Sequence, residues 1–187
     1  MFQVDIDKSL EVLVRGGVIL YPTDTVWGMG CDATSPASVE RIYAIKQRNE
    51  AQSMLTLVDG WEMLARYVGE VPDIAVQLME KASRPLSIIY PKAKNLAANL
   101  IAANGSIGIR IVQEPFCQQL IKAFGKPIVS TSANLSGQPT PGTFEDISGE
   151  IMEAVDYIVR WRQDDKQPAS ASSIVLLHED GSYQMIR

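Results

Sequence analysis

Short apolar runs alternate with helical patterns along the whole chain. The continuous apolar run at 18–21 is typical of a buried strand, and further strand candidates, rich in apolar residues, fall at 54–58, 86–90, 107–111, 128–130, 155–159, 173–177 and 183–186. Helical spacing of apolar residues falls at 5–15, 36–46, 73–82, 114–124 and 143–152. Because helices and strands alternate, the pattern predicts an α/β fold (α+β in some schemes), a sheet flanked by helices.

Capping and turn residues agree with these elements. Ser35-Pro36 places an N-cap residue before a proline at the first helical position, and Gly125 follows the last residue of 114–124. Asp180-Gly181 joins the last two strands in a tight hairpin, so we expect a mixed rather than a purely parallel sheet. The only histidine, His178, belongs to this turn, and we expect no metal or triad role for it.

Composition narrows the class of protein. The chain has 187 residues, of which 46% are hydrophobic and 21% charged. This predicts one globular domain over 1–187. A net charge of −5 argues against a general nucleic-acid coat but allows a local basic pocket. Cys31 and Cys117 are expected to be small buried hydrophobes. No cleavable apolar segment opens the chain and no apolar run approaches ~18 residues, so we expect a cytoplasmic protein without membrane contact.

The most informative polar cluster follows the predicted strand at 127–130. There the chain opens into Ser130, Ser132 and Asn134, which core packing does not require. Hydroxyls and an amide at a strand end lie where open α/β sheets bind ligands. On its own the run is more typical of a polar turn.

Two further polar clusters change that balance. Pro22-Thr-Asp-Thr25 follows the apolar run at 18–21, and Lys46-Gln-Arg48 ends a predicted helix. An arginine can hold two phosphate oxygens while a lysine acts as a point charge. Cations at a helix C-terminus also stabilise the helix by ~0.3–1 kcal/mol, and that interpretation would prevail if the pair stood alone.

The clusters together resemble one family. The chain contains Pro-Thr-Asp-Thr-x-x-Gly at 22–28, Lys-x-Arg at 46–48 and Ser-x-Asn at 132–134, and continues with 106–110 and 172–175 to Arg187. Each motif is weak alone, but five in this order resemble the YrdC-like family over essentially the whole chain. The resemblance implies a three-layer, twisted mixed sheet around a concave ligand cavity. It also implies a nucleotidyltransferase activity, L-threonylcarbamoyladenylate synthesis from L-threonine, bicarbonate and ATP with Mg²⁺, for tRNA modification.

The resemblance also assigns roles to individual residues. It implies catalytic roles for Lys46 and Arg48, which we expect on a polar rim, and no protein-held metal, since magnesium would be carried by ATP. Asp24 is a candidate contact for magnesium or water, or the centre of an Asx turn. Without the resemblance, a surface ion pair is the ordinary role of an arginine such as Arg110. The implied threonine contacts are Thr23, Thr25, Arg110 and Ser173; the implied ATP contacts are Lys46, Arg48, Gln52, Ser106, Ser130, Ser132, Asn134, Thr140 and Arg187.

Departures from the family pattern keep an alternative open. The loop after Arg48 lacks the usual prolines, Arg84 replaces a usual glycine, and Trp27 replaces a usual tyrosine. These changes are compatible with a YciO-like paralogue that has low or different activity and binds double-stranded RNA or nucleotide through the same cavity. Under either reading tRNA or double-stranded RNA is a candidate partner, and a downstream threonylcarbamoyl-transfer protein is a candidate acceptor of the adenylate.

Overall fold

A computed structural model describes residues 2–47 and 54–187. Its strands form one sheet in the order β7-β1-β2-β6-β3-β5-β4-β8-β9. The pairs β1–β7, β3–β5 and β4–β8 are parallel and the others are antiparallel, so the predicted mixed sheet is confirmed. The strands are β1 (Ile19–Tyr21), β2 (Gly28–Gly30), β3 (Leu55–Val58), β4 (Leu86–Tyr90), β5 (Ile107–Ile111), β6 (Ile128–Ser132), β7 (Tyr157–Ile158), β8 (Ser173–Leu177) and β9 (Tyr183–Met185).

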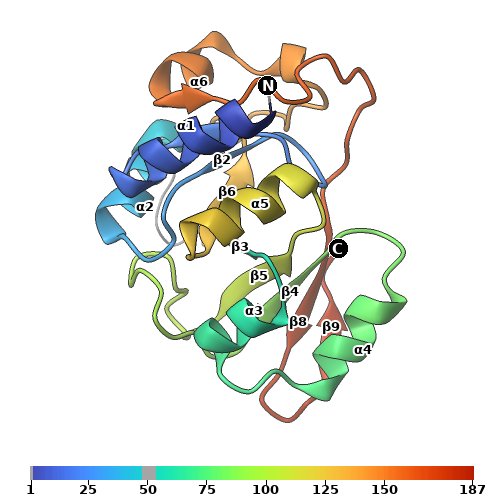
Figure 1. The fold of residues 1–187 in the computed structure, drawn as a ribbon. Helices are drawn as coiled ribbons and strands as arrows, with labels where there is room; N and C mark the ends of the chain where they lie inside the picture. The colour runs from blue at the N-terminus through green and yellow to red at the C-terminus, as the bar shows by residue number, and fades with distance from the viewer. Residues whose placement is uncertain (1, 48–53) are drawn as a thin grey trace.

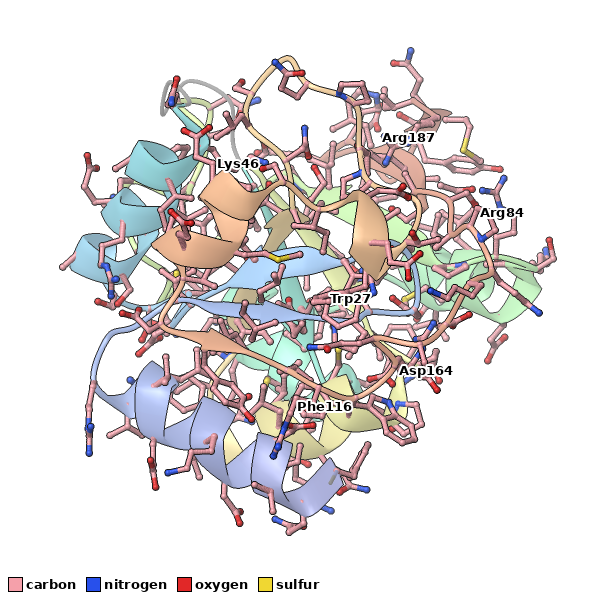
Figure 2. The ribbon with its side chains drawn as sticks, turned by 90° about the horizontal axis from the view of Figure 1, so that it is seen from above. Trp27, Lys46, Arg84, Phe116, Asp164 and Arg187 are labelled. Carbon is pink, nitrogen blue, oxygen red and sulfur yellow. The ribbon has the colours of Figure 1, made fainter. Side chains whose placement is uncertain are left out.

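Helices lie on both faces of the sheet. α1 and α5 run side by side on one face (Figure 1), where the rings of Phe2 and Phe116 meet edge to face with their centroids 5.8 Å apart. Seen from above, Lys46 in α2 and Phe116 in α5 lie on opposite sides of the strands (Figure 2). The helices are α1 (Phe2–Val14), α2 (Pro36–Lys46), α3 (Trp61–Val68), α4 (Asp73–Lys81), α5 (Pro115–Phe124) and α6 (Gly149–Ala154).

Local capping explains where the helices begin. The Ser35 hydroxyl accepts a hydrogen bond from the Ser38 N–H at the start of α2, as predicted. The predicted single helix at 143–152 is wrong. The capping box of Thr143 and Asp146 opens only a 3₁₀ turn, Phe144–Asp146, and Ser148 caps the separate helix α6.

One strand escaped the sequence pattern because it consists of Gly28, Met29 and Gly30. A Cβ atom on Gly30 would lie 2.6 Å from the Tyr21 ring and 2.7 Å from the Val129 carbonyl oxygen. Glycine is therefore required where β2 packs between β1 and β6. This places the loop at 22–27, which carries the Pro-Thr-Asp-Thr motif, beside the end of β6.

The remaining sequence expectations concern side chains away from the sheet edge. Cys31 and Cys117 are buried free thiols, and burial raises the pKa of both, which confirms their role as small hydrophobes. His178 lies in the β8–β9 hairpin, where its backbone N–H donates to the Ser182 backbone carbonyl. Within the described ranges, no helix combines the length and apolar character needed to cross a bilayer.

Candidate functional site

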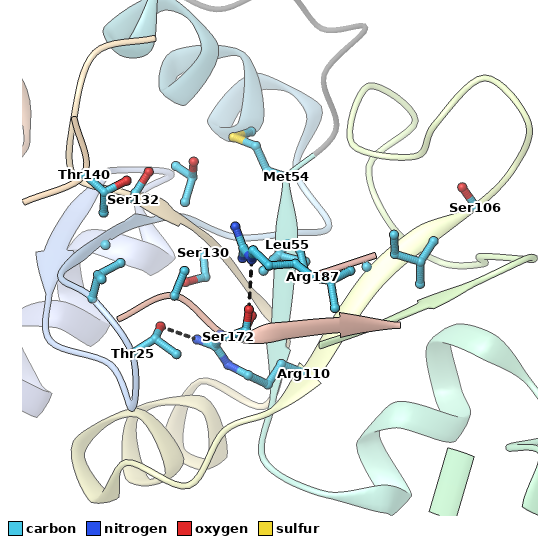
Figure 3. A pocket seen from close by; sticks show the side chains of 17 residues that line it. Thr25, Met54, Leu55, Ser106, Arg110, Ser130, Ser132, Thr140, Ser172 and Arg187 are labelled. Atoms are coloured by element: carbon cyan, nitrogen blue, oxygen red, sulfur yellow. Dashed lines mark hydrogen bonds between the residues drawn. The ribbon is translucent and has the colours of Figure 1, made fainter. Parts of the chain in front are cut away.

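A polar cavity of about 350 Å³ opens where the ends of β2, β3 and β6 face β5 and the segment before β8 (Figure 3). Its walls combine hydroxyls and two arginines with a few apolar side chains. Because the lining comes from widely separated parts of the sequence, the cavity depends on the tertiary fold. The lining residues are Thr25, Val26, Gly28, Met54, Leu55, Ile89, Ser106, Gly108, Arg110, Ser130, Thr131, Ser132, Thr140, Ala171, Ser172, Ile174 and Arg187.

The buried positive charge in the cavity wall is Arg110, near the end of β5. Its side chain is only 3% exposed. Its Nη2 lies 3.1 Å from Asp24 Oδ1 and donates to Thr25 Oγ1 at 3.3 Å. Its buried Nε has no hydrogen-bond partner among the described residues. A buried guanidinium with a vacant donor is prepared to receive an anionic ligand group.

The end of β6 supplies hydroxyls from three consecutive residues, Ser130, Thr131 and Ser132. Lys46 fixes the backbone at this end of β6, because its Nζ donates to the carbonyl oxygens of Ser132 and Asn134, each at 2.7 Å. Lys46 is only 2% exposed and is not one of the lining residues. The expectation of a rim position for Lys46 is therefore wrong, since this ammonium is buried against the backbone that carries the Ser-x-Asn motif.

A second cavity, of about 570 Å³, adjoins the first at Thr140. Asn134 lines it together with apolar residues such as Leu135 and Pro139. The Asn134 amide nitrogen donates to the carbonyls of Leu135 and Gln138. Its Oδ1 is buried with no partner in the described chain. The two motif residues Ser132 and Asn134 thus face different cavities.

The segment before β8 forms another wall, and three side chains fasten it. The Ser172 and Ser87 hydroxyls share a hydrogen bond of 2.9 Å. Arg187 Nε donates to the Ser172 carbonyl at 3.0 Å, as Figure 3 shows. Outside the cavity, Arg84 Nη2 donates to Ser170 Oγ and to the carbonyl of residue 171. Arg84, a departure from the family pattern, therefore braces this wall.

The structure brings together most of the residues selected from the sequence. Thr23 is buried below the cavity, where its hydroxyl bonds to Thr25 Oγ1 and the Val26 carbonyl. Ser173 is absent from the lining, whereas its neighbour Ser172 is present. Arg48 and Gln52 lie outside the described residues. Those that line the first cavity are Thr25, Ser106, Arg110, Ser130, Ser132, Thr140 and Arg187.

Acidic side chains are scarce near this cavity. Asp24, a candidate magnesium contact in the sequence, pairs with Arg110 and accepts a hydrogen bond from the Gln113 N–H at 3.1 Å. In the described part of the chain, no three His, Cys, Asp or Glu side chains gather as a metal site would require. The donors of the cavity suit carboxylate and phosphate oxygens.

The fold and the cavity define a mixed α/β protein with an anion-receptive cavity at the central strands of the sheet. The family model of Sua5, YciO and YrdC proteins, described as "Telomere recombination", matches residues 11–187. The chain belongs to this family. The threonylcarbamoyl-AMP synthase of Pseudoalteromonas translucida is 35% identical over 160 residues, which cover 84% of this chain and 86% of that protein. That of Vibrio campbellii is 31% identical, with 82% and 85% covered.

Solved structures have the same fold. YciO from E. coli matches with a TM-score of 0.84 and 26% identity, covering 100% of this chain and 89% of that one. Sua5 from P. abyssi, in complex with L-threonine, matches with a TM-score of 0.85 and 22% identity, covering 97% of this chain. This chain spans about half of that Sua5 chain, 53%.

Proposed function

We propose that this protein is an L-threonylcarbamoyladenylate synthase, a nucleotidyltransferase that uses L-threonine, bicarbonate and ATP. The observation that carries the proposal is the meeting of Arg110, Thr25 and the β6 hydroxyls in one cavity. The names of the relatives that are 31–35% identical over most of the chain support it. The role of its product in tRNA modification, a downstream transfer protein and a cytoplasmic location are further parts of the proposal.

The reaction joins three substrates. The threonine amine and bicarbonate form a carbamate with loss of water. A carbamate oxygen then bonds to the α-phosphorus of ATP, the bond from that phosphorus to the β-bridging oxygen breaks, and pyrophosphate leaves. This chemistry depends on positioning and charge neutralisation. It fits a cavity that offers cations and hydroxyls, and magnesium enters with the ATP.

Each group in the cavity has a proposed role. Arg110 holds the threonine carboxylate, with Thr25 beside it, because the guanidinium is the buried cation of that wall. The β6 hydroxyls and Arg187 hold the nucleotide at the other side of the cavity. Lys46 contributes by fixing the backbone of the Ser-x-Asn motif. Arg48, from the same family motif, is proposed to contact phosphate.

The match to E. coli YciO favours one alternative, a paralogue that binds nucleotide or double-stranded RNA through this cavity with little synthase activity. Two arginines that such binding would use are already engaged. Arg110 is buried against Asp24, and Arg84 donates to the wall before β8. Because RNA backbone binding relies on accessible cations, the synthase remains the better supported function.

Pyrophosphate release separates the two functions. We expect the purified protein to release pyrophosphate from ATP–magnesium only when L-threonine and bicarbonate are both present. Mass spectrometry of the reaction mixture should then detect threonylcarbamoyl-AMP. Parallel reactions that omit bicarbonate or replace threonine by another amino acid serve as controls. Turnover that ignores threonine, or no turnover with all substrates present, would favour the paralogue.

A further inference from the structure

The Asp24 carboxylate joins the Pro-Thr-Asp-Thr loop to the end of β5. One oxygen, Oδ1, lies 3.1 Å from Arg110 Nη2, and the other, Oδ2, accepts the Gln113 N–H at 3.1 Å. The Asp24 side chain is 10% exposed and does not belong to the lining of the first cavity. It therefore lies behind Arg110, where it contacts the guanidinium without facing a ligand in the cavity.

Arg110 depends on this carboxylate for compensation of its buried charge and for its orientation. Taking a guanidinium out of water is costly unless an opposite charge compensates it, and Asp24 is the ion-pair partner of Arg110 within the described residues. Both known contacts, to Asp24 and to Thr25 Oγ1, involve the same nitrogen, Nη2. Holding the guanidinium by Nη2 leaves Nε without a hydrogen-bond partner among the described residues.

We propose that Asp24 is a positioning residue that acts through Arg110, fixing Nη2 so that the remaining N–H groups of the guanidinium are presented to the substrate carboxylate. This inference rests on the proposed function, in which that carboxylate belongs to L-threonine. Because Asp24 also holds the Gln113 N–H, it fixes the loop that carries Thr25 to the same strand end. One side chain thus aligns two threonine contacts.

The geometry of the two Asp24 contacts indicates a sharp test. The Gln113 N–H donates to Oδ2, whereas Oδ1 attracts the Arg110 guanidinium by charge at 3.1 Å and makes no hydrogen bond within the described residues. An asparagine has one acceptor oxygen and turns its NH₂ group toward either Arg110 or Gln113, so one contact becomes donor against donor. Loss of the negative charge alone would strengthen the attraction of Arg110 for a carboxylate. The proposal therefore predicts a higher KM for threonine, whereas removal of the charge alone would lower this KM.

Steady-state kinetics of pyrophosphate release test the proposal. We expect Asp24→Asn to raise KM for threonine by about tenfold, equivalent to about 1.4 kcal/mol, with KM for ATP changed less than about twofold. Asp24→Glu keeps the buried charge compensated and so preserves folding, but its longer side chain displaces the guanidinium, and we expect a similar rise in KM for threonine.

The matched control is Asp156→Asn. In the wild type, the Asp156 carboxylate also accepts a backbone N–H, from Val18, and pairs with Arg41. It lies away from the cavity lining, so both KM values should stay unchanged.

A double-mutant cycle distinguishes positioning from general structural support. If Asp24 acts through Arg110, Asp24→Asn added to Arg110→Lys should change KM for threonine by less than about twofold. A purely structural role would repeat the full tenfold effect in that background. An unchanged or lowered KM in Asp24→Asn alone would overturn the proposal.

A readout without substrate separates this inference from the proposed function. The Nε–H signal of Arg110 in a ¹⁵N NMR spectrum, assigned by its loss in Arg110→Lys, should shift or broaden in Asp24→Asn and Asp24→Glu but not in Asp156→Asn. A wild-type protein without threonine-dependent turnover would contradict the proposed function, while this signal would still test the positioning. An Arg110 signal that is the same in wild type and both Asp24 variants would overturn it.

Discussion

Replacing Lys46 by methionine should destabilise the protein although the side-chain volume is nearly kept. The ammonium makes hydrogen bonds of 2.7 Å to the Ser132 and Asn134 carbonyls and is 2% exposed. A hydrogen bond to a charged group contributes ~1.5–3 kcal/mol, so two give about 3–6 kcal/mol. Removing the buried charge also removes its desolvation cost, which offsets part of this loss. We therefore expect the free energy of unfolding to fall by about 2–4 kcal/mol.

Thermal and chemical unfolding measure this loss. For a chain of this length each kcal/mol lowers Tm by about 2–4 °C, so we expect a drop of roughly 4–16 °C. Lys126→Met is the matched control. Its Nζ lies 2.7 Å from Asp32 Oδ2, and the Lys126 side chain is 49% exposed although Asp32 is 9% exposed. Solvent screens the Lys126 ammonium, so its loss should cost less than the loss of the Lys46 ammonium.

The same variant tests the link between Lys46 and the nucleotide. Calorimetric titration well below the lowered Tm should show weaker ATP binding by Lys46→Met, because the backbone of Ser132 and Asn134 has lost its anchor. Lys126→Met should bind ATP as the wild type does. If Lys46→Met unfolds within about 1 kcal/mol of the control, the bonds to the two carbonyls do not organise the end of β6 and the reasoning is refuted.

Two further predictions concern Arg110 and the thiols. Arg110→Ala should weaken threonine use by ~2–5 kcal/mol, because the substrate carboxylate would be left unpaired, and Arg110→Lys should recover only part of this; equal threonine titrations of all three proteins would place the carboxylate site elsewhere. Burial raises the pKa of Cys117 and of Cys31 above the usual thiol range, so the native protein should resist iodoacetamide at pH 8 and react at both positions once denatured. Rapid labelling of the folded protein would contradict this assignment.

The sequence predicts best those elements whose side chains share one environment. The strands β5 and β8 occupy the predicted 107–111 and 173–177, because segments rich in isoleucine, leucine and valine suit strands within a sheet. β2 could not be predicted in this way, since its glycines are required by the approach of Tyr21 and Val129 rather than by a hydrophobic pattern. The helix α3, Trp61–Val68, was also missed, although its apolar residues do recur at helical spacing.

The sequence could not distinguish neighbouring residues of a motif that lie differently relative to the cavity. Ser172, just before β8, lines the cavity, whereas Ser173, chosen from the family motif and the first residue of β8, does not. The motif at 172–175 contains both serines and carries no signal that distinguishes them. The outward or inward direction of such a pair becomes known only when the β4–β8 register is fixed, with Leu86 opposite Ser173.

The two cations of the motifs differ in a way that only the tertiary structure defines. The helical spacing around Lys46 predicts a solvated helix end. In the structure α2 ends against the backbone at the end of β6, and the Lys46 ammonium donates to two carbonyls there. The sequence predicts Arg110 as a surface residue of a short strand. In the structure Asp24, 86 positions earlier in the chain, supplies an opposite charge that compensates the burial of Arg110. Lysine suits the carbonyl pair because its three rotatable N–H bonds reach separate acceptors. Arginine suits the proposed substrate carboxylate because a planar guanidinium can take both oxygens of one carboxylate. Exchanging the two residue types should therefore impair both positions, although each exchange preserves the charge.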